Sequence, residues 1–152
     1  AMIGFPSNYV TTNEHVQSQV DGLVMSSKCG KIDNNHKVAR IHECFLPSVL
    51  ERGSPGEFRN FSHSSRAGVK FPEPYELHKK LKSCHLVRDK AWIRHLLYEY
   101  IHPFCDGNGR SGRIILANDL DYDFPKINQL IGSDYIPTIV KQMEANKLEN
   151  LL

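Results

Sequence analysis

Apolar side chains recur along most of this chain at spacings of three and four residues, which is the period of an amphipathic α-helix. Prolines, glycines and capping side chains divide this pattern into segments. The expected helices cover residues 14–26, Asp33 or Asn34 to just before Pro47, 74–84, 89–101, 107–121, 125–131 and 133–144, with a last turn or two through Leu148 and Leu151. The pattern therefore predicts an all-α fold.

The spacing also predicts which faces of these helices are buried. In residues 14–26 the apolar stripe is interrupted by Asp21–Gly22, which predicts a short helix with a weak end. In residues 74–84 the lysines are expected to face the solvent. The first stripe consists of Val16, Val20, Leu23 and Val24, the apolar face of the second helix consists of Tyr75, Leu77, Leu81 and Cys84, and further core positions are His42, Phe45, Trp92, Leu96 and Leu97.

Residues 52–74 break the helical period, because glycine and proline recur through them. Apolar side chains flank a polar tip at residues 62–66, as in a short two-stranded ribbon around a longer turn. The flanking residues are Phe58, Phe61, Val69 and Phe71. We therefore expect a small β-hairpin in an otherwise helical protein.

The composition limits the class of protein. A chain of 152 residues fits one domain, and a formal charge of +2 is too small to indicate a nucleic-acid or membrane partner. No apolar run approaches the ~20 residues that span a bilayer, and the first ten residues lack the pattern of a signal peptide. The four cysteines have no metal-binding or disulfide spacing, which favours reduced thiols in the cytoplasm.

Residues 102–113, HPFCDGNGRSGR, concentrate the residue types of catalysis and phosphate binding. Pro103 ends the preceding helix at His102, where the helix dipole favours a positive charge by roughly 0.3–1 kcal/mol. The next helix begins near Gly107, and its free amides form an anion site to which Arg110 and Arg113 add charge. An acid beside a phosphate site repels its ligand unless a cation lies between them, so Asp106 is expected to bind Mg²⁺.

Two other interpretations of this stretch fail on their context. Residues 107–112 match the GxGxxG pattern of dinucleotide-binding domains, but that pattern requires a preceding strand in a βαβ unit, and the preceding residues are predicted to be helical. A P-loop is excluded because no Gly-Lys-Ser/Thr follows a glycine-rich loop. The histidines have no zinc-binding spacing.

At these residues the chain resembles the Fic (filamentation induced by cyclic AMP) family. The family motif is His-Pro-Phe-x-Asp/Glu-Gly-Asn-Gly-Arg-x-x-Arg, and each specified position is present. The resemblance covers about residues 38–148 of a single domain spanning 1–152, and it implies a compact helical Fic fold that transfers AMP from ATP to a Ser, Thr or Tyr hydroxyl of a target protein.

The resemblance also implies a role for each motif residue. His102 is the general base, Asp106 holds Mg²⁺ on the nucleotide, and Asn108 with the amides around Gly107 and Gly109 neutralises charge at the α-phosphate. Arg110 and Arg113 bind the outer phosphates. Tyr135 matches loosely a family tyrosine that approaches the adenosine, with core packing as the alternative.

In the family a Gly-x-aromatic-Arg segment, here Gly56–Arg59, leads into a β-hairpin flap over the active site. The flap pairs with the main chain of the target, a form of strand addition. The residues expected to contact the target are Arg59, Phe61, His63 and Val69.

Several alternatives remain for how the activity is inhibited and for which reaction the site performs. Many family members are inhibited by a glutamate in a Ser/Thr-x-x-x-Glu-Gly/Asn helix, of which Ser18–Gly22 and Glu149–Asn150 are incomplete copies. The alternatives are that this restraint is absent, that it comes from an antitoxin-like partner, or that it was lost by truncation. The expected location is the cytoplasm, or a host cell if the protein is a bacterial effector. The alternatives to AMP transfer are use of another nucleotide, removal of AMP, and a module that binds nucleotide or a partner without turnover.

Overall fold

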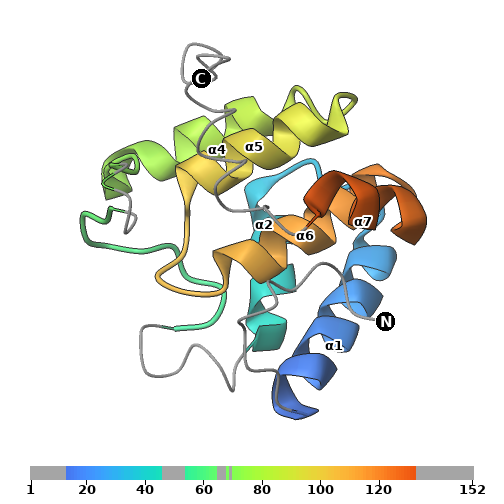
Figure 1. The fold of residues 1–152 in the computed structure, drawn as a ribbon. Helices are drawn as coiled ribbons and strands as arrows, with labels where there is room; N and C mark the ends of the chain where they lie inside the picture. The colour runs from blue at the N-terminus through green and yellow to red at the C-terminus, as the bar shows by residue number, and fades with distance from the viewer. Residues whose placement is uncertain (1–12, 46–53, 65–67, 69, 133–152) are drawn as a thin grey trace.

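A computed structural model of the chain describes residues 13–45, 54–64, 68 and 70–132. These residues are mainly helical, which confirms the predicted class (Figure 1). The expected helix over 133–144, the C-terminal turns, Val69 and Tyr135 lie outside the described residues. The elements are α1 (Asn13–Cys29), α2 (Asn35–His42), η1 (Glu43–Phe45), η2 (Pro74–Glu76), α4 (Leu77–His85), α5 (Ala91–Ile101), α6 (Asn108–Asp119) and α7 (Phe124–Ile131).

Local signals account for several helix ends. Asn34 caps α2 by accepting a hydrogen bond from the amide of Lys37, at 2.9 Å. Asp123 caps α7 in the same way through the amide of Lys126, and Pro125 lies in its first turn, where a missing N–H costs little. The N-terminus of α6 is capped by Gly107, in the left-handed region.

Helix α6 lies in the middle of the molecule and packs against α1, α2, α5 and α7 (Figure 1). Buried hydrogen bonds join it to α5, from the Tyr98 hydroxyl to the Ser111 hydroxyl at 2.7 Å and between His95 Nδ1 and the carbonyl of Gly112 at 3.2 Å. The core around this helix includes Ile32, Val38, Ile41, Phe45, Leu77, Leu81, Leu96, Leu97, Ile101, Phe104, Ile114, Ile115, Leu116 and Ile127. The motif therefore lies at the start of a helix that packs against α1, α2, α5 and α7.

The face of α1 that packs inward differs in part from the predicted stripe, of which Leu23 does pack against the core. Val20 and Val24 are exposed, whereas Ser18, Gly22 and Ser26 are buried. A Cβ atom at Gly22 would lie 2.6 Å from Ile114 Cδ1 and 3.3 Å from Phe45 Cε1. Gly22 is therefore the point at which α1 approaches α6, and α1 continues through it to Cys29.

The predicted apolar face of residues 74–84 is correct except at its start. Leu77, Leu81 and Cys84 are buried, but Tyr75 is 85% exposed. Tyr75 lies in the 3₁₀ turn η2, whose period differs from that of α4, and it therefore points away from the face that the helical spacing assigns to it.

The hairpin is present only as a single bridge among the described residues. Ser64 pairs with Lys70 in antiparallel fashion, and the amide of Phe71 donates to the carbonyl of His63 at 3.1 Å. No strand is assigned in the described ranges. The β-hairpin flap therefore stays a prediction.

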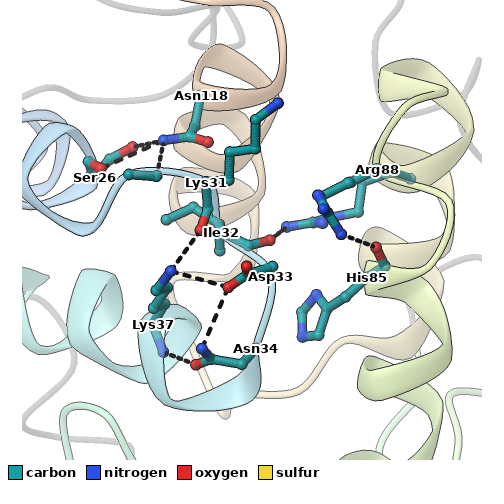
Figure 2. A network of polar contacts seen from close by, with 11 residues as sticks. Ser26, Lys31, Ile32, Asp33, Asn34, Lys37, His85, Arg88 and Asn118 are labelled. Carbon is teal, nitrogen blue, oxygen red and sulfur yellow. Dashed lines mark hydrogen bonds and ion pairs between the residues drawn. The ribbon is translucent and has the colours of Figure 1, made fainter.

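Polar contacts tie the α1–α2 connection to the end of α6 (Figure 2). The side-chain amide of Asn118 donates to Ser26 Oγ at 3.0 Å and to the carbonyl of Gly30 at 2.8 Å. Lys37 bonds to the carbonyl of Lys31 and to Asp33, each at 2.9 Å. No described helix is long and apolar enough to cross a bilayer.

Candidate active site

His102 is the C-cap of α5, and its backbone is left-handed, with φ 50° and ψ 60°. Its amide donates to the carbonyl of Tyr98 at 3.0 Å, and Pro103 then directs the chain away from the helix axis. A non-glycine residue in this region is strained, and such strain persists only where surrounding contacts enforce it. The sequence thus predicts the end of α5 correctly at His102.

The His102 ring is covered by residues of the segment around the predicted flap. It stacks on Phe71 with ring centroids 4.0 Å apart and planes 6° from parallel, and His63 lies 5.1 Å away. Burial, and then the nearby His63 and Arg59, lower the pKa of His102 to about 3. Burial thus outweighs the helix dipole, which was expected to favour the charged ring. The imidazole is neutral and has a nitrogen that can accept a proton.

Arg59 links the backbone at the end of α5 to the segment that covers His102. It is 4% exposed, and its amide also donates to the carbonyl of Pro103 at 2.9 Å. Its guanidinium bonds to four backbone oxygens, which belong to Phe61 (3.0 Å), Pro72, Ile101 (3.2 Å) and His102 (2.7 Å). A side chain so enclosed does not face a target. Arg59 instead fastens both sides of the predicted flap to the end of α5.

Asn108 closes the loop that follows His102. Its side-chain oxygen accepts from the amide of Phe104 and its nitrogen donates to the carbonyl of Phe104, both at 2.8 Å, and both residues are buried. Both polar ends of this side chain are occupied by the loop itself. Asn108 thus fixes the shape of the loop, and its expected contact with an α-phosphate stays a prediction.

Asp106 and Arg110 meet at the start of α6. Asp106 Oδ1 accepts from the amide of Gly107 at 2.8 Å and lies 3.9 Å from Nη2 of Arg110. The Arg110 guanidinium is buried and lies over the ring of Phe45, 5.0 Å from its centroid. The Asp106 carboxylate is 39% exposed, whereas the Arg110 side chain is buried beside it. The N-terminus of α6 therefore carries an accessible carboxylate next to a buried cation.

The residues present fit a magnesium ion shared with phosphates. Among the described residues no group of three His, Cys, Asp or Glu side chains is placed to hold a metal. Mg²⁺ is commonly bound by one or two carboxylates together with substrate phosphates and water. The exposed carboxylate of Asp106, which lies just before the N-terminus of α6, is a ligand of that kind.

Arg113 lies against the first turn of α6. It is buried, and a Cβ atom at Gly109 would lie 3.1 Å from its Nη1 atom. The structure thus brings Arg113 to the same helix end as Arg110, as the spacing predicts, and Gly109 leaves the room that its guanidinium occupies.

The remaining flap residues differ in exposure. Phe61 is 43% exposed and His63 is partly buried against Phe71. Val69 and Tyr135 lie outside the described residues. Of the residues expected to contact a target, Phe61 is thus the most accessible one that the structure places.

One residue of the site was interpreted from its spacing only as a packed core position. His42, at the end of α2, is buried as expected, but its ring also bonds to the backbone of Asp106 and of Gly56. No local pattern relates α2 to the motif, so the sequence carries no signal for this contact.

Comparison with known proteins gives one family and one fold. The Fic/DOC family matches residues 27–118, more than half of the chain. The crystal structure of a Fic family protein from Desulfovibrio desulfuricans G20 superposes with a TM-score of 0.59 at 16% sequence identity, and the match covers 95% of this chain and 47% of that chain. The chain therefore spans less than half the length of that protein. No curated protein matches.

Proposed function

The chain belongs to the Fic/DOC family, and from that premise we propose that it is a protein adenylyltransferase, which transfers AMP from ATP to a Ser, Thr or Tyr hydroxyl of a target protein. The observation that carries this proposal is the loop from His102 to Asn108. It joins a neutral imidazole at the end of α5 to the first-turn amides and two arginines at the start of α6. A base and a phosphate site are thereby held on opposite ends of one short, internally bonded loop.

In the proposed reaction the target hydroxyl attacks the α-phosphorus of ATP, and pyrophosphate leaves. His102 accepts the hydroxyl proton. With a pKa of about 3 the imidazole is a weak base towards a free alcohol, but the hydroxyl becomes strongly acidic as its bond to phosphorus forms. Proton transfer is therefore coupled to that bond, and positioned general-base catalysis of this kind contributes about 10²–10⁴-fold.

The start of α6 binds the triphosphate in this proposal. Backbone amides after Gly107, together with Arg110 and Arg113, offset the charge that develops on the phosphates. Asp106 would hold Mg²⁺, which when bound supplies further positive charge to the phosphate oxygens. Asn108 contributes through the loop that it closes on Phe104.

The target is proposed to dock beside the His102 ring along residues 61–71. Phe71 and His63 cover one side of the imidazole, so the hydroxyl must approach the ring at its edge, where the nitrogens lie. The exposed Phe61 is the anchor that the described residues offer to the target.

The proposal is tested by supplying labelled ATP together with a cell lysate and detecting proteins that gain AMP. Parallel reactions with CTP, GTP and UTP, read by mass spectrometry, separate AMP transfer from use of another nucleotide. Absence of transfer together with absence of ATP binding in a direct titration contradicts the assignment. ATP binding without transfer indicates a nucleotide-binding module.

His102→Ala is expected to lower transfer by about 10²–10⁴-fold while Mg·ATP still binds, because the base is lost and the amides of α6 remain. The titration that measures binding in the wild type serves for the variant. Lys79→Ala, on the exposed face of α4, is the matched control and should leave both quantities unchanged. Equal activity of His102→Ala and wild type would remove His102 as the base.

A further inference from the structure

His42 packs against residues 102–108, here called the phosphate loop, although it comes from a distant part of the sequence. It is the last residue of α2 and has no solvent exposure. Its ring stacks on Phe104 with centroids 3.7 Å apart and planes 3° from parallel, and it meets Phe45 edge-on at 5.8 Å. The ring is thus confined on two sides within the core.

Both ring nitrogens of His42 are used by backbone groups. The amide of Gly56 donates to Nδ1 at 2.8 Å, so Nδ1 carries no hydrogen. A neutral imidazole then has its hydrogen on Nε2, which donates to the carbonyl of Asp106 at 2.7 Å. The backbone on either side therefore sets the tautomer of the ring.

The bond to Asp106 fixes one peptide plane of the loop. In a trans peptide the carbonyl and the following N–H point in opposite directions. The carbonyl of Asp106 points to His42, so the amide of Gly107 points away from it, and that amide donates to Oδ1 of Asp106 at 2.8 Å. A single peptide plane thus links the His42 ring to the direction of the Asp106 carboxylate.

Close approach of the ring requires a glycine after Asp106. Gly107 has φ +79°, and a Cβ atom there would lie 3.2 Å from Nε2 of His42 and 3.3 Å from Cδ2 of Phe45. The left-handed turn and the absence of a side chain together let the peptide lie on the ring.

We propose that His42 is a positioning residue of the nucleotide site. By holding the Asp106–Gly107 peptide, it orients the carboxylate that receives Mg²⁺ with the nucleotide, and through Gly56 it joins this loop to the segment that carries Arg59. The inference rests on the proposed function in taking Asp106 as the magnesium ligand.

The two hydrogen bonds can be removed separately. His42→Gln places an amide nitrogen near the position of Nε2 and keeps a donor for Asp106, whereas His42→Asn places its oxygen near the position of Nδ1 and keeps only an acceptor for Gly56. His42→Phe keeps the stacked ring and loses both bonds. Affinity for ADP is measured by calorimetry for each variant, with and without Mg²⁺.

His42→Asn and His42→Phe are expected to weaken Mg·ADP binding by about 10–100-fold, the usual effect of removing a partner of a metal ligand, with a smaller change for ADP alone. His42→Gln is expected to stay near wild type. The matched control is His85→Gln, since His85 is also a buried histidine bonded through Nε2, to Asn35 Oδ1 at 2.8 Å, away from the loop. It should bind Mg·ADP as wild type does.

Amide hydrogen exchange provides a readout that needs no nucleotide. Gly107 should lose protection in His42→Asn and His42→Phe, while Gly56 keeps it in His42→Asn. Unchanged protection of Gly107 in His42→Phe overturns the positioning role, as does an equal loss of Mg·ADP affinity in His42→Gln and His42→Asn. Failure of the wild type to bind ADP contradicts the proposed function instead, and exchange at Gly107 then decides the role of His42.

Discussion

Gly107 is the residue at which the phosphate loop depends most on backbone geometry. It caps α6 with φ +79°, and its neighbours leave no room for a side chain. Gly30, between α1 and α2, has a similar φ of +69°, but an added Cβ atom there would meet no atom within 4 Å. Comparing substitutions at Gly107 and Gly30 therefore separates the free-energy cost of a left-handed backbone from the cost of crowding.

Alanine at either position is expected to destabilise the fold, but by different amounts. Gly30→Ala should cost about 1–2 kcal/mol, the strain of an L-residue in the left-handed region. Gly107→Ala should cost about 1–3 kcal/mol more, because His42, Phe45 and Arg110 must move. Urea unfolding of both variants measures the difference, and equal losses of stability would show that the contacts at Gly107 relax freely.

At the scale of elements, Arg59 connects the predicted flap to helix α5. Its guanidinium lies between the carbonyl oxygens that end α5 and those on either side of the flap. The same connection keeps Phe71 on the His102 ring. Because burial is the first cause of the low pKa of His102, that pKa reports whether the cover is in place.

Arg59→Lys is expected to raise the pKa of His102 from about 3 towards its usual 6.5. Lysine keeps the positive charge but lacks the planar fork that bonds several carbonyls at once, so the cover over His102 loosens and water reaches the ring. An NMR titration of the imidazole measures the change. Arg40→Lys, at an exposed position on α2, is the control. A pKa that stays near 3 in Arg59→Lys means that the cover does not depend on the guanidinium.

At the scale of the whole molecule, local signals predict the helices but not how they pack. Asn34 begins α2 and Pro103 ends α5 through contacts within a few residues, so the sequence predicts those boundaries. The buried face of α1 is set by Gly22, which meets Ile114 on a distant helix. Hydrophobic spacing contains no information on that contact, and it therefore assigns Val20 and Val24 wrongly to the buried face.

The candidate site likewise contains residues whose place is predicted by the local sequence and residues whose contacts depend on the folded chain. Asp106, Gly107 and Arg110 are close in sequence, and the structure brings them together at the start of α6, while His102 ends α5 as predicted. Arg59 and His42 act through backbone carbonyl and amide groups far along the chain, whose positions exist only in the folded protein. The family resemblance predicts a target contact for Arg59 and the helical spacing predicts a core position for His42, but neither predicts the backbone groups to which these side chains bond.

The buried pair of Arg94 and Asp119 joins helix α5, the end of α6 and the α1–α2 connection. Arg94 Nη2 donates to the carbonyl of Ile32 at 2.6 Å, and its Nε lies 3.7 Å from Oδ2 of Asp119 at the end of α6. Burial raises the pKa of Asp119 to about 6, despite the opposing effect of Arg94. Folding therefore favours the protonated carboxyl group, while the unfolded chain releases the proton near pH 3.8.

The contribution of Asp119 to stability is thus fully present below pH 3.8 and is lost as the pH rises through about 6. A shift of about two pKa units corresponds to on the order of 3 kcal/mol. Asp119→Asn removes this titration and keeps the shape of the side chain, and the cost of an uncharged partner for Arg94 is the same at each pH. The free energy of unfolding of the variant relative to wild type should therefore rise by about 3 kcal/mol between pH 4 and pH 7 in urea titrations. Parallel curves for the two proteins would mean that the pKa of Asp119 is the same in the folded and the unfolded chain, so that burial does not favour the protonated carboxyl group.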